Sequence, residues 1–422
     1  MRKVVYCPES LLPDTLDSNI LYFSLFTSTK NKKIGHVGIE LPKAIRRYGL
    51  TPSVQAWDFA TIASSVVATD HAILRKESAD GWTRMIELSI CLVEPAVWNT
   101  KRAELEFLLR FLTGDFWTLQ FLPGGLNVPR ADITRNLNTD CVCLLSGGID
   151  SLVGAIDLTS AGKKPFFVSQ LVRGSRSAQA KFAAELNGSD RHLQWSYAEG
   201  HPGATENSTR SRSLIFFAFA ALAASAISPT QTQAVEIFVP ENGFISLNIP
   251  LVPGRLGSLS TKTTHPVYTA GIQDLWDAVG IPARLSFPYQ YNTKGDILIN
   301  CADQALLVNL IGDSISCGKY QRHNLTHCGV CVPCLVRRAA FLKANLQDAT
   351  VKGYVYDSLA HSGSRDVAAA AAAYIRYKAM GIQRFTSATL SFSPYNKHKQ
   401  YEDVVAKGMD ELGLLLNKQG VI

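Results

Sequence analysis

A glycine-rich loop between an apolar strand and a helix limits the possible folds of this chain more than any other sequence feature. The loop reads SGGIDS over residues 146–151, follows the apolar run CVCLL (141–145), and leads into the helix-forming segment SLVGAIDL (151–158). Two glycines let a backbone approach an anion closely, and the N–H groups that open a helix point toward it. The segment therefore predicts a βα unit of a parallel sheet, with a phosphate-binding loop at its turn.

Five residues of this loop are candidate nucleotide-binding groups. The serine hydroxyls add hydrogen-bond donors, and the aspartate is placed to hold Mg²⁺ or to orient the loop. No Gly-Lys-Ser/Thr sequence occurs here, so the loop differs from a Walker motif. An ordinary glycine-containing turn is the alternative interpretation. The candidates are Ser146, Gly147, Gly148, Asp150 and Ser151.

The segments after the loop alternate between strand and helix patterns. PFFVSQL (165–171) and VEIFVP (235–240) are rich in the branched and aromatic residues of strands, whereas 177–186 and 213–227 have helical patterns. Such alternation is typical of parallel, doubly wound sheets. We therefore expect a Rossmann-like α/β fold for the central domain, residues 139–345.

Different patterns flank this central domain on both sides. Residues 1–130 combine strand-like runs with a helical pattern, which predicts a separate α+β accessory module. The segment LPGGLNVPR (122–130) has two prolines and two glycines and marks the predicted boundary. Residues 346–422, which include an alanine run (368–373), predict a C-terminal helical extension. The strand-like runs are 20–26, 37–41 and 85–93, and the helical patterns are 102–113 and 401–416.

Four of the nine cysteines cluster in the segment SCGKYQRHNLTHCGVCVPCLVRR. Four thiolates at such short spacings match a tetrahedral Zn²⁺ site, and with no ligand position left open the metal would be structural. A redox-active pair and an iron–sulfur cluster are the alternatives. His323 and His327 in the same loop would serve as substitute ligands or as hydrogen-bonding neighbours of the site. The predicted metal ligands are Cys317, Cys328, Cys331 and Cys334.

Composition and charge narrow the class of protein further. The 422 residues include 42 Lys and Arg against 35 Asp and Glu, a net charge of +7. This mild excess permits contact with phosphates but makes nucleic acid an unlikely partner. The N-terminus lacks the apolar core of a signal peptide, and the apolar run 213–227 is too short to span a bilayer. We therefore expect a cytoplasmic protein with no membrane partner, in a compartment that keeps cysteines reduced.

The SGGIDS loop resembles the SGGxDS signature of the PP-loop ATP pyrophosphatases. Those enzymes cleave ATP between its α- and β-phosphates and adenylate a substrate oxygen. With four clustered cysteines about 170 residues later, the chain resembles the QueC-like 7-cyano-7-deazaguanine synthase family over about residues 139–345. The resemblance implies ATP, Mg²⁺ and a structural Zn²⁺ as cofactors, and a deazaguanine carboxylate as the group that is activated.

The resemblance also implies a catalytic set, carried over position by position. Lys294 in NTKGDIL matches a family lysine that precedes an acidic residue, whereas Arg212-Ser213 stands where the family has an Arg-Asn pair. The implied catalytic residues are Ser146, Asp150, Ser151, Lys294 and Arg212.

Two departures separate the chain from the short synthases. Long segments precede the loop and follow the cysteines, whereas the short synthases begin at the loop. In addition, a polar insert (241–266) stands where the family's substrate loop is expected. These features resemble the longer QueC-like proteins of bacterial anti-phage systems, such as those of the Qat and CBASS operons. Relatives in that group are implicated in joining a deazaguanine to the N-terminus of a partner protein.

The insert itself is a candidate substrate-binding loop. Glu241 closes the strand 235–240 at the sheet edge where open α/β sheets bind ligands, and one carboxylate accepts both N–H groups of a guanine-type edge. Arginine and hydroxyl groups in the insert suit carboxylates or phosphates. A solvated polar loop is the alternative. The candidate substrate-binding residues are Glu241, Asn242, Arg255, Ser258, Thr261 and His265.

Together with these features, the resemblance implies an ATP-dependent ligase. It would adenylate the carboxylate of 7-carboxy-7-deazaguanine and join it to an amine, expected to be the N-terminus of a partner protein from the same defence operon. An ordinary 7-cyano-7-deazaguanine synthase that uses ammonia is the first alternative. A PP-loop enzyme that modifies tRNA and a non-enzymatic scaffold are the others; the intact SGGIDS loop argues against the scaffold.

Overall fold

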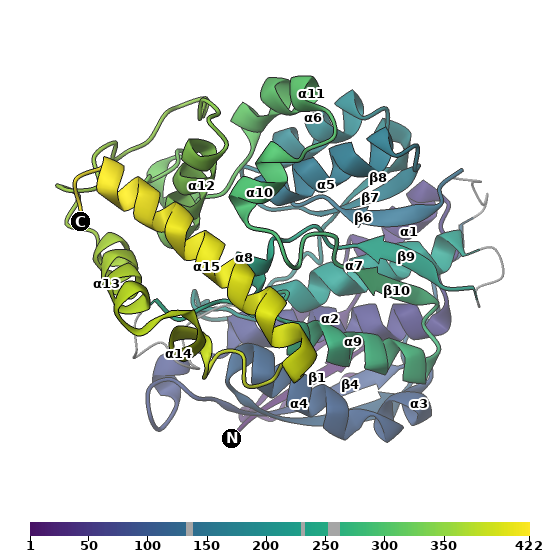
Figure 1. Ribbon diagram of the computed structural model, residues 1–422. Helices are drawn as coiled ribbons and strands as arrows, with labels where there is room; N and C mark the ends of the chain where they lie inside the picture. The colour runs from purple at the N-terminus through teal and green to yellow at the C-terminus, as the bar shows by residue number, and fades with distance from the viewer. Residues whose placement is uncertain (132–137, 229–232, 252–261) are drawn as a thin grey trace. The chain divides into compact units, whose positions relative to one another are not determined.

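Two parallel sheets of five strands each organise the described chain. The computed structural model describes residues 1–131, 138–228, 233–251 and 262–422 (Figure 1). These residues group into two compact units, each assembled from several stretches of the sequence. One unit contains Met1–Val142, Leu193–Ile237 and Thr261–Leu285, and the other contains Cys143–His192, Phe238–Ser260 and Ser286–Ile422.

The first sheet is built from the N-terminal strands in the order β3-β2-β1-β4-β5. Its neighbouring strands all run parallel, with Tyr6 of β1 opposite Phe23 of β2 and Ile90 of β4. The predicted α+β module is therefore wrong: helical crossovers return the chain to the same end of the sheet, so β4 and β5 pair in parallel. The elements are β1 Arg2–Cys7, β2 Ile20–Leu25, β3 Gly35–Val37, β4 Met85–Leu92, β5 Phe116–Pro123, α1 Leu41–Tyr48, α2 Val54–Ala72, α3 Pro95–Thr100 and α4 Arg102–Thr113.

Two further helices belong to this unit. Helix α7 (Arg212–Ile227) packs along α2, and α9 (Pro266–Val279) packs against α4. Both α2 and α7 are buried on almost every side, which explains why the run at 213–227 is apolar without a polar face. The predicted helix at 102–113 is confirmed as α4, and it ends at Gly114 in the left-handed conformation.

The second sheet has the order β10-β9-β6-β7-β8. The chain runs from β6 outward through β7 and β8, and then continues on the other side of β6 with β9 and β10. The strand order thus reverses between β6 and β9, which is where open α/β sheets bind ligands beyond the carboxyl ends of their strands. The elements, which confirm the predicted alternation, are β6 Cys141–Leu144, α5 Ile149–Ser160, β7 Pro165–Gln170, α6 Arg176–Glu185, β8 His192–Trp195, β9 Val235–Phe238 and β10 Ala283–Ser286.

Helices dominate the C-terminal part of the chain. The long helix α15, yellow in Figure 1, packs against α8, α10, α12, α13 and α14. Its apolar side chains Val404, Val405, Met409 and Leu412 are buried in a core shared with α12 and α13. These elements are α8 Gly243–Ser246, α10 Lys294–Ile299, α11 Gln304–Leu310, α12 Val332–Lys343, α13 Arg365–Met380, α14 Ile382–Thr386 and α15 Tyr395–Lys418.

None of the helices in the described ranges combines the length and the apolar character that a membrane span requires.

Candidate functional site

The SGGIDS loop joins β6 to α5, as its sequence predicts, and its hydroxyls hold it in one shape. Ser151 Oγ donates to the carbonyl of Gly148 (3.0 Å), and Ser146 Oγ donates to Ser151 Oγ (3.0 Å). The N–H of Gly148 donates in turn to Ser146 Oγ (3.3 Å). Gly147 has a φ of 87°, a backbone conformation that L side chains rarely adopt. The turn therefore depends on a glycine at position 147.

Residues outside the loop fix its backbone carbonyls. Gln179 Nε2 donates to the carbonyls of Ser146 and Gln170 (both 3.1 Å), and the N–H of Ile315 donates to the carbonyl of Gly147 (2.9 Å). Ser146 remains exposed and Gly148 half-buried. The loop is thus anchored from behind and accessible from solvent at the N-terminal end of α5, the geometry of an anion-binding turn. Gln179 had no sequence signal, since a glutamine inside a helical pattern normally faces solvent.

Asp150 is buried at the base of the loop and meets residues far away in the sequence. Its Oδ1 forms an ion pair with Lys294 Nζ, and both side chains are less than a tenth exposed. Its Oδ2 accepts hydrogen bonds from Asn242 Nδ2 (2.6 Å) and from the N–H of Asn242 (3.3 Å). Three predicted site residues from separate segments therefore converge beside the loop.

Both polar atoms of the Asn242 side chain form hydrogen bonds within the protein. While Nδ2 donates to Asp150, Oδ1 accepts from the N–H of Ile245 (3.1 Å) and caps the N-terminus of α8. The side chain is fully buried. Asn242 thus orients Asp150 instead of presenting a free amide to a substrate.

Glu241 lies three residues beyond Phe238, the last residue of β9, and is half-buried. Burial, and then the neighbouring charge of Asp150, raise the pKa of Glu241 to about 8, although the charge of Lys294 acts in the opposite direction. The Glu241 carboxyl is therefore protonated near neutral pH and shares a hydrogen bond with Asp150. A strongly perturbed carboxyl beside a charged partner is typical of functional sites.

The C-terminal helix α15 supports the lysine of this cluster. Thr293 caps α10, at whose first residue Lys294 lies, and its Oγ1 also donates to the Glu411 carboxylate of α15. Gly295 approaches Glu411 so closely that an added Cβ would lie 2.5 Å from its Oε1. Burial raises the pKa of Glu411 to about 7. Sequence reasoning missed Glu411 because an acidic residue in an amphipathic helix carries no sign of a distant partner.

The remaining predicted residues lie elsewhere. Arg212 opens α7 in the other compact unit with an exposed side chain. His265 belongs to the same unit, where its Nδ1 accepts the N–H of Val267 (3.3 Å) and caps α9. Burial lowers the pKa of His265 to about 4, so the ring is neutral and acts as a cap. Arg255, Ser258 and Thr261 lie outside the described residues.

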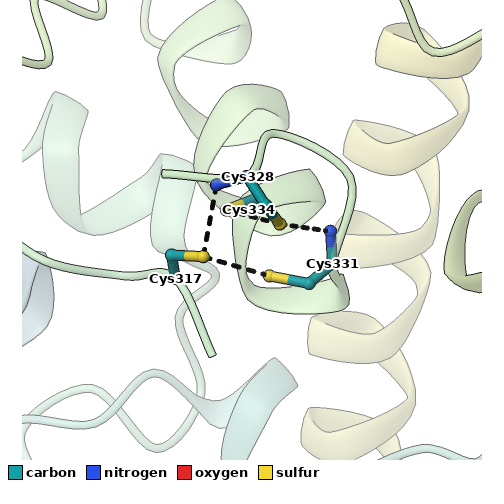
Figure 2. Close-up of side chains that lie close together, drawn as sticks. All are labelled: Cys317, Cys328, Cys331 and Cys334. Carbon is teal, nitrogen blue, oxygen red and sulfur yellow. Dashed lines mark hydrogen bonds between the residues drawn. The ribbon is translucent and has the colours of Figure 1, made fainter. Parts of the chain in front are cut away.

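The four clustered cysteines converge on one buried point, as Figure 2 shows. Their sulfur atoms all lie within 4.8 Å of one another, and the Cys317–Cys331 and Cys328–Cys334 pairs are both 3.9 Å apart. Tetrahedral Zn–S bonds of roughly 2.3 Å would place the sulfurs roughly 3.8 Å apart. The cluster can therefore hold a structural metal ion such as zinc.

Backbone groups are arranged to stabilise thiolates in this cluster. The N–H groups of Lys319 and Cys328 both donate to Cys317 Sγ (3.3 Å), and the N–H of Cys331 donates to Cys328 Sγ (3.3 Å). His327 is not a ligand: its Nε2 accepts the N–H of Ser316 (3.2 Å), one residue before Cys317. His327 therefore fits the predicted role of a hydrogen-bonding neighbour of the site and not that of a substitute ligand.

A pocket of about 290 Å³ lies between α6 and the segment that leads into the cysteine loop. Its wall includes Ile315, whose N–H donates to the carbonyl of Gly147, so the pocket adjoins the rear of the SGGIDS loop. Lys181 and Asp313 form an ion pair at its wall (2.7 Å), and His327 and Lys352 add further polar groups. The volume is at the lower end of the range for small-molecule pockets.

Comparisons of the chain with protein-family models, with curated proteins and with solved structures find no match in any of the three.

Proposed function

We propose that this protein is an ATP-dependent ligase that adenylates a carboxylate and then joins it to an amine. One observation carries the proposal: Asp150, Asn242, Glu241 and Lys294 converge beside a serine- and glycine-lined anion loop. The cluster lies where the strand order of the second sheet reverses, between β6 and β9. The resemblance to PP-loop enzymes supports the choice of ATP over other phosphate ligands.

The loop and the buried cluster have separate roles in this proposal. The substrate carboxylate attacks the α-phosphorus of ATP, the bond to the bridging oxygen breaks, and pyrophosphate leaves into the SGGIDS loop. Lys294 balances the charge of Asp150 and adds positive charge near the leaving group. Mg²⁺, which prefers carboxylate oxygens, would be held by Asp150 and would neutralise phosphate charge. The amine then attacks the acyl carbon and AMP leaves.

Glu241 is the proposed recognition group for a deazaguanine substrate. A guanine-type edge presents two neighbouring N–H donors, and an ionised carboxylate accepts both. Because the pKa of Glu241 is about 8 in the free protein, such a substrate must displace a proton when it binds at neutral pH. The resemblance to the QueC-like family supports 7-carboxy-7-deazaguanine as this substrate.

The amine acceptor is proposed to be the N-terminus of a partner protein of an anti-phage system. The N-terminal five-stranded sheet, β3-β2-β1-β4-β5, offers surface that an enzyme using ammonia does not need. The net charge of +7 over 422 residues gives little support to tRNA as the acceptor. We further propose that the cysteine cluster holds a structural Zn²⁺, which ties the loop around Cys317 to α12.

The test is to incubate the full chain with ATP, Mg²⁺ and 7-carboxy-7-deazaguanine, adding ammonium to one sample and a peptide with a free N-terminus to another. Mass spectrometry should detect AMP and an amide of the peptide amine. Asp150→Ala should abolish both products, and Asp190→Ala, which changes an exposed aspartate, should not. Complete conversion to the nitrile with ammonium alone would favour the ordinary synthase instead. ADP in place of AMP would contradict the proposal.

A further inference from the structure

Two cysteines of the N-terminal sheet, Cys7 and Cys91, lie in direct contact. Their sulfur atoms are 2.9 Å apart, and neither takes part in a disulfide. Both side chains are less than a tenth exposed. They belong to neither the phosphate loop nor the four-cysteine cluster, so the proposed function leaves them without a role.

The strand pairing of the sheet places the two thiols together. Strands β1 and β4 are parallel neighbours in which Tyr6 pairs with Ile90, so the next positions along both strands are Cys7 and Cys91. Paired residues of adjacent strands point to the same face. Neighbouring strands lie about 4.8 Å apart, within the Cα separation of about 4.4–6.8 Å that disulfides allow. A bond of about 2.05 Å therefore requires the sulfurs to approach by about 0.9 Å, without a change of register.

The two cysteines lie at the carboxyl ends of the neighbouring strands β1 and β4. The strand order β3-β2-β1-β4-β5 reverses between β1 and β4, so the two thiols mark the end of the sheet where a ligand crevice would be expected. Segments of the same unit run across these strand ends. The N–H of Gly125 donates to the carbonyl of Leu92 (3.0 Å), and Leu11 lies against Gly124. Both thiols are thus covered by the chain.

The two sulfurs differ in acidity in a way that suits stepwise oxidation. The hydrogen bond that the two thiols share lowers the pKa of Cys91 and, together with burial, raises the pKa of Cys7. Cys91 is therefore the thiol that ionises first, and the thiolate is the nucleophilic form. Cys7 stands ready as the resolving thiol.

We propose that Cys7 and Cys91 are a reversible oxidation site that forms a disulfide between β1 and β4. With hydrogen peroxide as the oxidant, the Cys91 sulfur attacks one peroxide oxygen, the O–O bond breaks, and Cys91 becomes a sulfenic acid while water leaves. The Cys7 sulfur then attacks the Cys91 sulfur, the S–O bond breaks, and a second water leaves. Two thiols and one peroxide thus give one disulfide and two waters. A dithiol reductant restores both thiols by exchange.

The test is peptide mapping of the full chain after treatment with hydrogen peroxide and alkylation of the remaining thiols. Cleavage after Lys and Arg gives residues 4–30 and 85–101, each of which contains one cysteine. We expect these two peptides to be recovered as one cross-linked species that is lighter by two hydrogens than their sum. Dithiothreitol should separate them.

Two variants distinguish pairing from general thiol oxidation. Cys7→Ser should abolish the cross-link and leave Cys91 as a sulfenic acid that a dimedone probe traps. Cys301→Ser, which removes another buried cysteine, whose Sγ donates to the carbonyl of Asp303 (3.8 Å), should leave the cross-link unchanged. Recovery of both peptides fully alkylated, after the four-cysteine cluster has been oxidised, would overturn the proposal. Cross-links of Cys7 or Cys91 to other cysteines would overturn it as well.

Discussion

Replacing Glu241 with glutamine should make the protein more stable at mildly alkaline pH. Burial, and then the charge of Asp150, raise the pKa of Glu241 from its ordinary value of 4.5 to about 8. A raised folded-state pKa means that the contribution of the protonated carboxyl to stability is complete below pH 4.5 and is lost as the pH rises to 8. Glutamine keeps the shape of the protonated carboxyl but cannot ionise, so the variant does not suffer this loss.

The size of the effect follows from the difference between the two pKa values. Each pH unit of difference corresponds to about 1.4 kcal/mol, which gives about 5 kcal/mol over the whole window. Glu241 is half-buried, so water screens part of its interaction with Asp150. We therefore compare the free energy of unfolding of Glu241→Gln with that of the wild type. From pH 4.5 to pH 8, the difference should shift by about 2–3 kcal/mol in favour of the variant.

Urea denaturation of both proteins at pH 4.5 and at pH 8 measures this gain. The same comparison in an Asp150→Asn background is the control, because the gain should shrink when the neighbouring charge is removed. A stability difference between wild type and Glu241→Gln that does not change with pH would refute the reasoning. It would show that Glu241 is not held beside Asp150 in its protonated form.

Three further changes have defined outcomes. Lys294→Met should lower the free energy of unfolding by about 3 kcal/mol in urea denaturation, because it leaves Asp150 buried without its cation; Lys181→Met, at an exposed ion pair, should not. Cys331→Ser should lose zinc, measured by elemental analysis, and destabilise the chain by about 3 kcal/mol or more; retained stoichiometric zinc would contradict the metal site. Glu411→Gln should gain up to about 3 kcal/mol on the wild type as the pH rises from 4.5 to 7, since burial raises this pKa also; equal pH profiles in urea would contradict that.

Local sequence patterns predicted most elements of the second sheet, since each strand and helix there carries its own signal. The strand at CVCLL, the SGGIDS turn and the helix after it occur as predicted. The four clustered cysteines also come together as their spacing predicts. These signals are short-range: a turn needs its glycines, and four thiolates close in sequence can meet at one metal.

Long-range arrangement was harder to predict. The N-terminal strands look alike whether they pair parallel or antiparallel, so only the structure shows that β1 to β5 form a parallel sheet. The partners of Asp150 lie 92 and 144 residues away, and no periodicity reports such a distance. Resemblance suggested Lys294 and strand position suggested Glu241, whereas the support from Glu411 depends on a contact between separate helices. Asn242, expected to bind substrate, instead holds Asp150 in place.

The most direct test of the central claim is isotope exchange between pyrophosphate and ATP. An enzyme that adenylates a carboxylate returns labelled pyrophosphate to ATP only when that carboxylate is present, because the adenylation step must run in both directions. We predict exchange that requires both Mg²⁺ and 7-carboxy-7-deazaguanine, is abolished in Asp150→Ala, and persists in Asp190→Ala. Exchange at the wild-type rate in Asp150→Ala, or none with the wild-type protein and every component present, would contradict the assignment of the SGGIDS loop and its buried cluster.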